Sequence, residues 1–478
     1  RDLLPEREMY EGIHGRHYNP TGGSKSEPQL ATGVHSRYLS RLFYPRHRSV
    51  TSMRVHMQTL GCRLNEAELE TWSRDFQIQG HRITDDPEQA DLLVVNTCAV
   101  TAEAVRKSRK LLARSRRRNP NARLVVSGCY ASLDPAAATR AEGIDLVVNN
   151  RDKDRLVEII HREMDLNVMP ESAIDQEISG LLERGRQRAF IKVQDGCRYR
   201  CTYCIVTLAR GEERSRPPAD IIDEINRLHE AGIQEAVLTG VHLGGYGSDA
   251  GSNLQALISR VLAETDLPRL RVGSLEPWDL PEGLWELFRN PRFMPHLHLP
   301  LQSGSDSVLR RMARRCRTDE YRQLITQARA RVTDFNVTTD LIVGFPGETE
   351  QEWQETLELT QEIGFGHLHI FAYSPRSGTK ATGLANPVSR EVKRERSEVL
   401  HALGRKMQRQ TLQRYVGRTL PVLVEGSGAS GWRGYTPNYL RVAIEAAEDA
   451  QLGNRIVDVR LTELNPEGNQ FVGSLVAD

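Results

Sequence analysis

The sequence lacks any long apolar run. No stretch of its 478 residues approaches the roughly 20 consecutive apolar residues that cross a bilayer, and nothing in it resembles a secretory signal. We therefore expect a cytoplasmic protein with no membrane partner. An excess of charge is also missing, because the formal net charge is only +1. That balance excludes a chain that is basic throughout and binds nucleic acid along its length, so any such surface must be local.

Cysteine is scarce, and its arrangement is informative. Of the seven cysteines, six fall into two groups of three. The odd total and this grouping argue against a disulfide framework and for a reducing compartment. Hydrophobic residues make up 39% of the chain, which is enough for packed cores, and the length leaves room for about three domains.

The first group, which we call the barrel triad, is Cys197, Cys201 and Cys204. It follows an apolar run and precedes Ala-Arg-Gly at 209–211, and the nearest downstream candidate for a fourth ligand is His229. A [4Fe-4S] cluster normally takes four thiolates and a structural zinc site takes four ligands. The spacing therefore predicts a cluster with one iron left open to bind something else. A structural zinc or ferredoxin knuckle is the alternative.

The second group, the front triad, is Cys62, Cys98 and Cys129. Each follows a short apolar run typical of a buried strand, and the segments between them are long enough for crossover helices, such as 65–79 and 102–118. This β-α-β-α-β pattern predicts a parallel sheet whose strands end at one edge, where the three thiols converge and hold a second open cluster. Three unrelated buried thiols are the alternative. The seventh cysteine, Cys316, has no partner at ligand spacing and is interpreted as incidental.

Beyond the front triad the pattern changes to six strand candidates separated by amphipathic helices. The alternation predicts a partial (β/α)6 barrel whose functional residues gather at the carboxyl ends of the strands. The strand candidates are 190–193, 235–241, 270–275, 296–301, 337–343 and 367–373, and helices are expected at 219–231, 254–264 and 350–363.

The last part of the chain has short alternating runs punctuated by Gly and Asn, which predict a small antiparallel β-barrel of OB-like size. Its turn at 434–439 carries aromatic and polar residues expected to stack on unpaired bases. The predicted class is thus α/β, with a Rossmann-like domain first. The expected divisions are a disordered extension (1–52), the front domain (53–164), a linker (165–187), the (β/α)6 barrel (188–410) and the terminal barrel (411–478).

From Met53 onward, this combination resembles the radical S-adenosylmethionine (SAM) methylthiotransferases, whose terminal barrel is called TRAM. Short motifs resemble most the branch that acts on N6-threonylcarbamoyladenosine at position 37 of tRNA, beside the anticodon. These motifs are Thr59-Leu-Gly-Cys62 with Asn65, Asn96-Thr-Cys98-Ala-Val-Thr101, Gly128-Cys129-Tyr130, Val193-Gln-Asp195-Gly-Cys197 and Thr239-Gly-Val-His-Leu243. Thr207 stands where the family usually has proline, a change expected to loosen the turn without removing a ligand.

The resemblance implies two [4Fe-4S] clusters and SAM as cofactors. The barrel triad would hold the cluster that cleaves SAM to a radical, which removes hydrogen from C2 of the adenine. The front triad would hold the cluster that presents sulfur, and a second SAM would supply the methyl group. No catalytic residue is expected beyond the cluster ligands, and the reductant would be a protein such as flavodoxin or ferredoxin. The expected SAM contacts are Tyr203, Gly240, Glu276, Gln302 and Asp340.

The sequence is also compatible with other functional hypotheses. The same chemistry could act on isopentenyladenosine in tRNA or on an aspartate of a ribosomal protein. A third possibility is a non-catalytic iron-sulfur protein that binds RNA or carries electrons, although electron carriers usually close all four cluster positions.

Two further patterns concern RNA and metals. Residues 411–478 carry six Arg and no Lys against eight Asp and Glu, so the basic run at 106–118 is the better candidate for tRNA phosphates, with a solvated helix face as the alternative. The histidine pairs His296/His298 and His367/His369 are interpreted as polar packing rather than a metal site, because no carboxylate accompanies them at close spacing.

Overall fold

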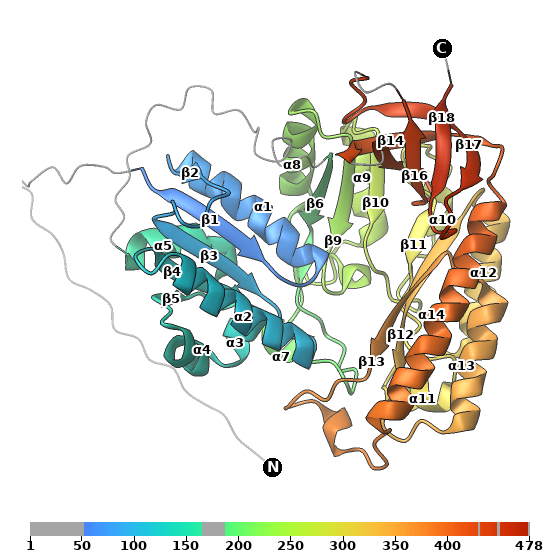
Figure 1. Ribbon diagram of the computed structural model, residues 1–478, viewed down its shortest axis with the longest axis horizontal. Helices are drawn as coiled ribbons and strands as arrows, with labels where there is room; N and C mark the ends of the chain where they lie inside the picture. Colours follow the sequence, from blue (N-terminus) through green and yellow to red (C-terminus); the bar gives the residue numbers. More distant parts are fainter. Residues whose placement is uncertain (1–51, 165–186, 429–430, 447–449, 477–478) are drawn as a thin grey trace, which may run out of the picture. The chain divides into compact units, whose positions relative to one another are not determined.

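The computed structural model describes residues 52–164, 187–428, 431–446 and 450–476 (Figure 1). The predicted disordered extension and linker lie almost wholly outside these ranges. In the part of the chain that is described, no helix combines the length and apolar character needed to cross a membrane.

The front domain is a five-stranded parallel sheet in the order β2-β1-β3-β4-β5. The three strands that precede the front cysteines, β1, β3 and β4, are neighbours in this sheet, as the sequence predicts. Buried valine and leucine side chains fill the strands because both faces of a parallel sheet are covered. The strands are β1 (Arg54–Thr59), β2 (Arg82–Ile83), β3 (Leu92–Thr97), β4 (Arg123–Gly128) and β5 (Leu146–Val147), and the helices are α1 (Arg63–Ile78), α2 (Ala102–Arg118), α3 (Cys129–Leu133), α4 (Pro135–Glu142), η1 (Lys153–Arg155) and α5 (Leu156–Glu163).

The middle of the chain forms the predicted partial barrel of six parallel strands. Two three-stranded sheets, β6-β9-β10 and β11-β12-β13, are joined by bridges from β10 to Phe293 and from Ser274 to His298. The strands are β6 (Arg188–Lys192), β9 (Glu235–Thr239), β10 (Arg269–Val272), β11 (His296–His298), β12 (Asn336–Val343) and β13 (His367–Ala372), and a short ribbon of β7 (Gln194–Asp195) and β8 (Arg214–Ser215) follows the first of them. The helices are α7 (Val206–Arg210), α8 (Pro218–Glu230), η2 (Leu243–Gly245), α9 (Leu254–Glu264), α10 (Leu284–Leu287), α11 (Asp306–Arg311), α12 (Thr318–Arg331), α13 (Glu350–Ile363), η3 (Lys380–Gly383) and α14 (Arg390–Gln413).

Local sequence signals explain why several helix limits were predictable. At α13, Thr349 accepts a hydrogen bond from the amide of Glu352 and the Glu352 carboxylate accepts one from the amide of Thr349, which is a capping box. Gly364 then ends the helix in the left-handed conformation with φ of 65°. The predicted and observed limits of α2, α9 and α13 are the same.

The terminal segment closes into a five-stranded barrel in the order β14-β15-β16-β18-β17. The prediction of a small barrel is confirmed, with two corrections. Strands β16 and β18 pair in parallel, because the last strand must insert between β16 and β17 to close the barrel. The runs expected to form strands in this segment, 419–425, 440–443, 456–461 and 471–476, do not include β15, whose glycines weaken the strand pattern. The strands are β14 (Thr419–Gly428), β15 (Gly431–Tyr435), β16 (Arg441–Glu445), β17 (Ile456–Leu464) and β18 (Phe471–Leu475).

The turn at 434–439 packs against the amino end of the six-stranded barrel. Arg269 donates to the carbonyl oxygen of Tyr435 at 3.0 Å, and Arg271 donates to that of Pro437 at 2.8 Å. The rings of Tyr435 and Tyr439 stack on each other at 4.9 Å, with the Arg188 guanidinium over both. The prediction that this turn reads bases is therefore wrong, since its polar groups and rings are already engaged.

Candidate functional site

The front triad is assembled at the carboxyl edge of the front sheet. Cys62 precedes α1, Cys98 follows β3, and Cys129 opens α3 directly after β4. Cys98 and Cys129 are buried, whereas Cys62 is exposed to solvent. Burial raises the pKa of the Cys98 thiol to about 11, and the neighbouring Cys129 and Cys62 add to the rise. The three cysteines therefore lie at the same edge of the sheet and close enough for their charges to interact, whereas ligation of a cluster by them stays a prediction.

Two glycines allow the front loops to approach this closely. Gly61 has φ of 119°, and a Cβ added there would lie 3.0 Å from Sγ of Cys98. Gly128 has φ of 96°, and a Cβ there would lie 2.2 Å from the carbonyl oxygen of Thr97. Any side chain at either position would push the cysteine loops apart.

The barrel triad lies in one loop between β7 and α7, and all three thiols are half-buried. Two hydrogen bonds hold this loop: the amide of Cys204 donates to the carbonyl oxygen of Cys201 at 3.0 Å, and the hydroxyl of Thr207, on α7, donates to that of Tyr199 at 2.8 Å. Thr207 therefore closes the loop, contrary to the expectation that it would loosen the turn. Burial raises the pKa values of Cys197 and Cys204 to about 12, so a metal would have to displace the thiol protons.

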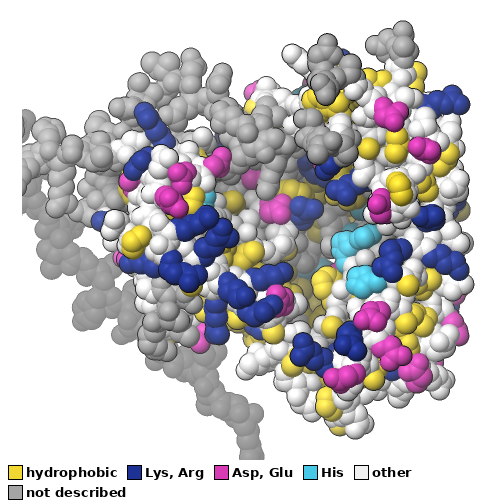
Figure 2. All heavy atoms as spheres, viewed as in Figure 1, with side chains coloured by type: hydrophobic (Ala, Val, Ile, Leu, Met, Phe, Trp, Pro, Cys, Tyr) yellow, Lys and Arg dark blue, Asp and Glu magenta, His cyan; other side chains and the backbone are white. Residues whose placement is uncertain are grey.

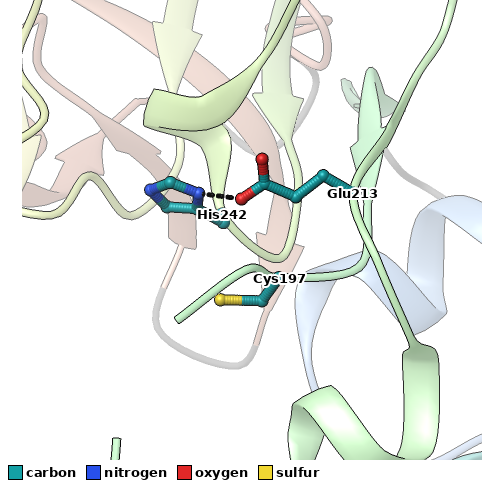
Figure 3. A group of neighbouring side chains, drawn as sticks. All are labelled: Cys197, Glu213 and His242. Carbon is teal, nitrogen blue, oxygen red and sulfur yellow. Dashed lines mark hydrogen bonds and ion pairs between the residues drawn. The ribbon is translucent and has the colours of Figure 1, made fainter. Parts of the chain in front are cut away.

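A carboxylate-bound histidine lies beside Cys197 (Figure 3). Ligand atoms of Cys197, Glu213 and His242 lie within 4.8 Å of one another. His242 is bonded at both ring nitrogens, through Nδ1 to Glu213 and through Nε2 to Asp279 at 2.6 Å. Burial opposes a charge on His242, but these two bonds outweigh it and raise its pKa. With no free nitrogen, His242 is poorly suited to bind a metal.

The role of this group is to hold the cysteine loop. Glu213 accepts a hydrogen bond from the amide of Arg198, the residue after Cys197, at 3.1 Å. Gln194 likewise joins this loop to the one after β9, because its Oε1 accepts from the amides of Val241 and His242 at 3.0 and 2.9 Å. No sequence pattern identifies Gln194, Glu213 and His242 as supporting residues.

Both triads fit iron-sulfur clusters. Each offers three soft sulfur donors, which are the ligands that iron-sulfur clusters take. In the front triad the close packing depends on glycines whose Cβ atoms would collide with a cysteine or its neighbouring backbone. The seventh cysteine, Cys316, packs in the hydrophobic core of the barrel.

The five residues expected to bind SAM lie on the loops and strands that lead from the barrel triad round the barrel. Tyr203 is half-buried, with its ring 6.5 Å from that of Phe345. Glu276 forms an ion pair with the fully buried Arg314 at 2.8 Å. The positive charge of Arg314 also acts on Cys201, so Arg314 interacts with one expected SAM contact and with one cysteine of the barrel triad, and no sequence pattern indicates either interaction.

The backbone conformation and packing fix the positions of two more of the expected SAM contacts, Gln302 and Gly240. Gln302 has φ of 73°, a strained conformation for a residue with a side chain, and its amide donates to the carbonyl oxygen of Asp340 at 2.8 Å. Gly240 packs against Gln194, whose Oε1 would lie 2.9 Å from an added Cβ. Contact of these five residues with SAM stays a prediction.

A carboxylate, Asp340, lies beside the histidine pairs, contrary to the prediction that none accompanies them. Its Oδ1 lies 3.1 Å from Nε2 of His298 and 3.3 Å from Nδ1 of His369, so a carboxylate does accompany them. The sequence hid this contact because Asp340 comes from a third strand, β12. The two histidines and Asp340 offer ligand atoms within 4.8 Å of one another. His296 instead packs against Tyr439, with ring centroids 5.0 Å apart.

The basic run forms the exposed face of α2, and Figure 2 shows Lys and Arg side chains gathered on this part of the front domain. Arg106 pairs with Glu103, and Arg116 lies 3.7 Å from Asp145. Among the described residues, no hydrogen bond or ion pair engages the side chains of four exposed members of the run, Lys110, Arg114, Arg117 and Arg118.

Comparison with known proteins agrees with this geometry. Residues 191–360 match the Radical SAM superfamily, and residues 54–149 match the uncharacterized protein family UPF0004. A solved structure of the radical SAM methyltransferase TsrM from Kitasatospora setae has a TM-score of 0.52 at 16% identity, over 68% of this chain and 77% of that one. At this identity the likeness concerns the fold alone.

Curated relatives match over most of their length. Threonylcarbamoyladenosine tRNA methylthiotransferase MtaB is 34% identical in Bacillus subtilis, over 87% of this chain and 96% of the relative, and 35% identical in Thermotoga maritima, over 87% and 95%. The tRNA-2-methylthio-N(6)-dimethylallyladenosine synthase of Geobacillus thermodenitrificans is 33% identical over 86% and 81%. This chain belongs to the radical SAM methylthiotransferase family.

Proposed function

We propose that this protein adds a methylthio group to C2 of N6-threonylcarbamoyladenosine at position 37 of tRNA. The observation that carries the proposal is the pair of three-cysteine sites, one at the edge of the front sheet and one in the loop after β7, in a chain about 34% identical to relatives named for this nucleoside. Each site offers three cysteines among the described residues, one fewer than the four thiolates that a [4Fe-4S] cluster normally takes, which suits clusters that must bind small molecules.

The cysteines would hold the two clusters. Cys197, Cys201 and Cys204 would ligate the cluster in the barrel, and the front triad would ligate the other. When bound, the barrel cluster supplies the electron that cleaves SAM, and the front cluster presents the sulfur. The protein contributes fixed positions, because a radical that must reach one C–H bond depends on orientation more than on acid–base groups.

Residues around the barrel would bind and orient SAM. Glu276 and Arg314 present a carboxylate and a guanidinium beside Cys201, and these groups suit the amino and carboxylate ends of an amino acid. Asp340 suits hydroxyl groups, because the two neighbouring histidines help to hold the pKa of its carboxyl well below its usual range, despite burial. Gln302, fixed by its strained backbone, has a side chain amide able to hydrogen-bond a base edge.

The exposed face of α2 would bind the tRNA backbone. Lys110, Arg114, Arg117 and Arg118 are exposed and engage no described partner, so binding phosphate breaks no existing ion pair. We further propose that the enzyme acts in the cytoplasm and takes electrons from a protein such as flavodoxin or ferredoxin.

Mass spectrometry of tRNA nucleosides tests the substrate. Deletion of the gene should remove the methylthio form of threonylcarbamoyladenosine and leave its unmodified parent, and the intact gene should restore it. If the isopentenyl nucleoside loses its methylthio group instead, the chemistry stands and the substrate is wrong. If no methylthio nucleoside changes, ribosomal protein becomes the next substrate to examine, and no change there would overturn the catalytic reading.

Charge removal on α2 tests the tRNA surface. The triple substitution Arg114→Ala, Arg117→Ala and Arg118→Ala should weaken tRNA binding roughly tenfold at low salt and flatten its salt dependence, because fewer counterions are released. A matched triple on exposed arginines elsewhere, Arg331, Arg390 and Arg405, controls for net charge. Equal losses in both variants would mean that α2 is only a solvated face.

A further inference from the structure

A cluster of buried charges lies between the front triad and the barrel triad. Five charged side chains form it, and none is more than 9% exposed. Two come from the front domain and three from the barrel, so the cluster crosses the boundary between the domains. Its members are Glu68 on α1, Lys153 on η1, Lys192 on β6, Asp195 on β7 and Arg210 on α7.

Arg210 is the centre of this cluster. Its Nη1 donates to Glu68 at 2.9 Å and to Asp195 at 3.0 Å, which joins a carboxylate of each domain through one nitrogen. Its Nη2 donates to Oδ1 of Asn65 at 2.7 Å. Lys153 also bridges the domains, since it pairs with Glu68 and lies 3.2 Å from Asp195.

The cluster reaches the front cysteines through two asparagines. The amide nitrogen of Asn65 donates to the carbonyl oxygen of Leu60 at 2.7 Å and of Thr97 at 3.3 Å, so it binds the loops that carry Cys62 and Cys98. Sγ of Cys62 lies 3.7 Å from Oδ1 of Asn65, the oxygen that Arg210 binds.

Asn150 makes the corresponding link to the third front cysteine. Its Nδ2 donates to the carbonyl oxygen of Ala209 at 2.7 Å and lies 3.8 Å from Sγ of Cys129. Its Oδ1 accepts from Lys153 at 3.3 Å. The residue next to Arg210 is thus fixed to the Cys129 side of the front triad.

On the barrel side the cluster ends at the cysteine loop. Asp195 stands two residues before Cys197, and its Oδ1 accepts from the amide of Gly196 at 2.8 Å. Gly196 has φ of 76°, and a Cβ there would overlap the carbonyl oxygen of Glu212 at 1.8 Å. The start of the barrel loop therefore has little freedom to move relative to Arg210.

The buried charges do not cancel. Three cations, Arg210, Lys153 and Lys192, face two carboxylates, which leaves one positive charge in excess. Two partly exposed groups at the rim, Asp154 and Arg214, cancel each other. An unmatched buried cation is costly unless an anion lies nearby. The front thiolates, once they bind metal, are such an anion, and the Arg210 charge already acts on Cys62 and Cys129.

We propose that Arg210 is a positioning residue that fixes the front triad relative to the barrel triad, and that its buried charge stabilises the reduced state of the cluster on the front triad. The inference rests on the proposed function, because it requires that the front triad holds a cluster. Reduction makes a cluster more negative, and net charge is among the factors that set cluster potentials. The guanidinium thus acts both as a fork joining the domains and as a fixed charge.

Redox titration of the enzyme loaded with both clusters, followed by electron paramagnetic resonance, tests the charge. Arg210→Gln should shift the front-cluster potential to more negative values and leave the barrel-cluster potential unchanged. Glu68→Gln removes a negative charge from the cluster of buried side chains around Arg210. It should therefore shift the reduction potential of the front iron-sulfur cluster to less negative values, opposite to the effect of Arg210→Gln. A purely structural role would not reverse sign between these variants.

Arg210→Lys separates the effect of the positive charge from the effect of the guanidinium hydrogen bonds to Glu68, Asp195 and Asn65. It keeps the positive charge and loses the shared bonds, so the front potential should stay near that of the wild type. The ratio of 5′-deoxyadenosine formed to methylthio product should rise by about 100-fold, because a small misplacement of the sulfur source costs that much. An unchanged ratio of 5′-deoxyadenosine to methylthio product would overturn the positioning role of Arg210.

A matched control is Arg188→Gln, which also removes a buried arginine from an ion pair, with Glu235 and Glu425 at the other end of the barrel. It should leave both potentials unchanged. If Arg210→Gln does not fold, Glu68→Gln and Arg210→Lys decide the matter alone. Wild-type enzyme that holds a single cluster by iron and sulfide analysis would refute the proposed function. Suppose instead that the wild type holds two clusters and that Glu68→Gln shifts the front-cluster potential to more negative values or leaves it unchanged. That result would refute only the role of Arg210.

Discussion

The front triad is built from the carboxyl ends of three neighbouring strands, whereas the barrel triad spans eight residues of one loop. Both present three thiols, but they depend on different parts of the structure. The front site needs the register of β1, β3 and β4 and the two glycines beside its cysteines. The barrel site needs hydrogen bonds within its loop and the carboxylate of Glu213.

This difference predicts different weaknesses. Disturbing the front sheet should remove the front cluster while the barrel site persists. Disturbing the barrel loop should do the reverse. A site made from residues far apart in sequence loses its geometry when any supporting element moves. The geometry of a site within one loop depends mainly on the residues that contact that loop.

The largest effect should come from the cysteines themselves. Cys98→Ala and Cys201→Ala should each abolish the methylthio nucleoside in cells and halve the iron content. Only Cys201→Ala should also abolish reductive cleavage of SAM, because the barrel loop does not use Cys98. Measurement of 5′-deoxyadenosine separates the two, and Cys316→Ala serves as the control that keeps both clusters. Loss of SAM cleavage in Cys98→Ala would mean that the two sites are not independent.

Gly128→Ala should break the front triad without touching a ligand. The added Cβ would collide with the Thr97 carbonyl at 2.2 Å and strain a backbone with φ of 96°. Strain and overlap together should cost roughly 2–6 kcal/mol of unfolding free energy, seen in denaturant unfolding with loss of the front cluster. Gly417→Ala also has positive φ but meets no atom within 4 Å, so it should cost only the strain, about 1–3 kcal/mol. Similar losses would show that the collision does not matter.

Acid offers a way to weaken the barrel at a point remote from both triads. Burial opposes the charge on Glu235, but Arg271 and Arg188 outweigh it and lower its pKa to about 2. The carboxylate therefore contributes stability above its ordinary pKa of 4.5, and this contribution is lost as the pH falls through 2.

Unfolding free energies of the wild type and of Glu235→Gln, measured across this range, should differ in their pH dependence by about 3 kcal/mol. Iron content of the folded variant at neutral pH should equal that of the wild type. Parallel pH profiles would contradict the role given to Glu235.

The smallest effect should come from Thr207→Val. It removes the hydroxyl that donates to the Tyr199 carbonyl at 2.8 Å and should cost about 1 kcal/mol. The barrel cluster should then be lost in air about fivefold faster, with the front cluster unaffected. Thr326→Val removes a similar hydroxyl-to-carbonyl bond on α12 and is the control. Faster loss of the front cluster in Thr207→Val would contradict the separation of the two sites.

Much of the fold was predictable because its signals are local. Apolar runs of strand length alternate with amphipathic helices, and the positions of α2, α9 and α13 follow from that pattern. The six strands of the barrel follow from it as well. The prediction that the turn at 434–439 binds bases was wrong. Its Tyr, Thr and Asn residues are typical of an exposed loop, and only the tertiary contacts with Arg269 and Arg271 make the turn an interface.

The supporting residues of the site were harder to predict. Glu68, Lys153 and Arg210 are charged, and charged residues are almost never fully buried unless they are paired. Their partners come from another domain, so no spacing along the chain reveals them. The same holds for Asp340, whose histidine neighbours lie on two other strands.

The sequence by itself determined the six thiols, the two domains that carry them and the order of strands and helices, because cysteine spacing and hydrophobic period act over short distances. Only the tertiary structure decided how the two triads are held relative to each other and which charges lie between them. The reason is physical: an ion pair buried between domains forms once both surfaces have been removed from water, and its energy depends on distances that no single segment specifies.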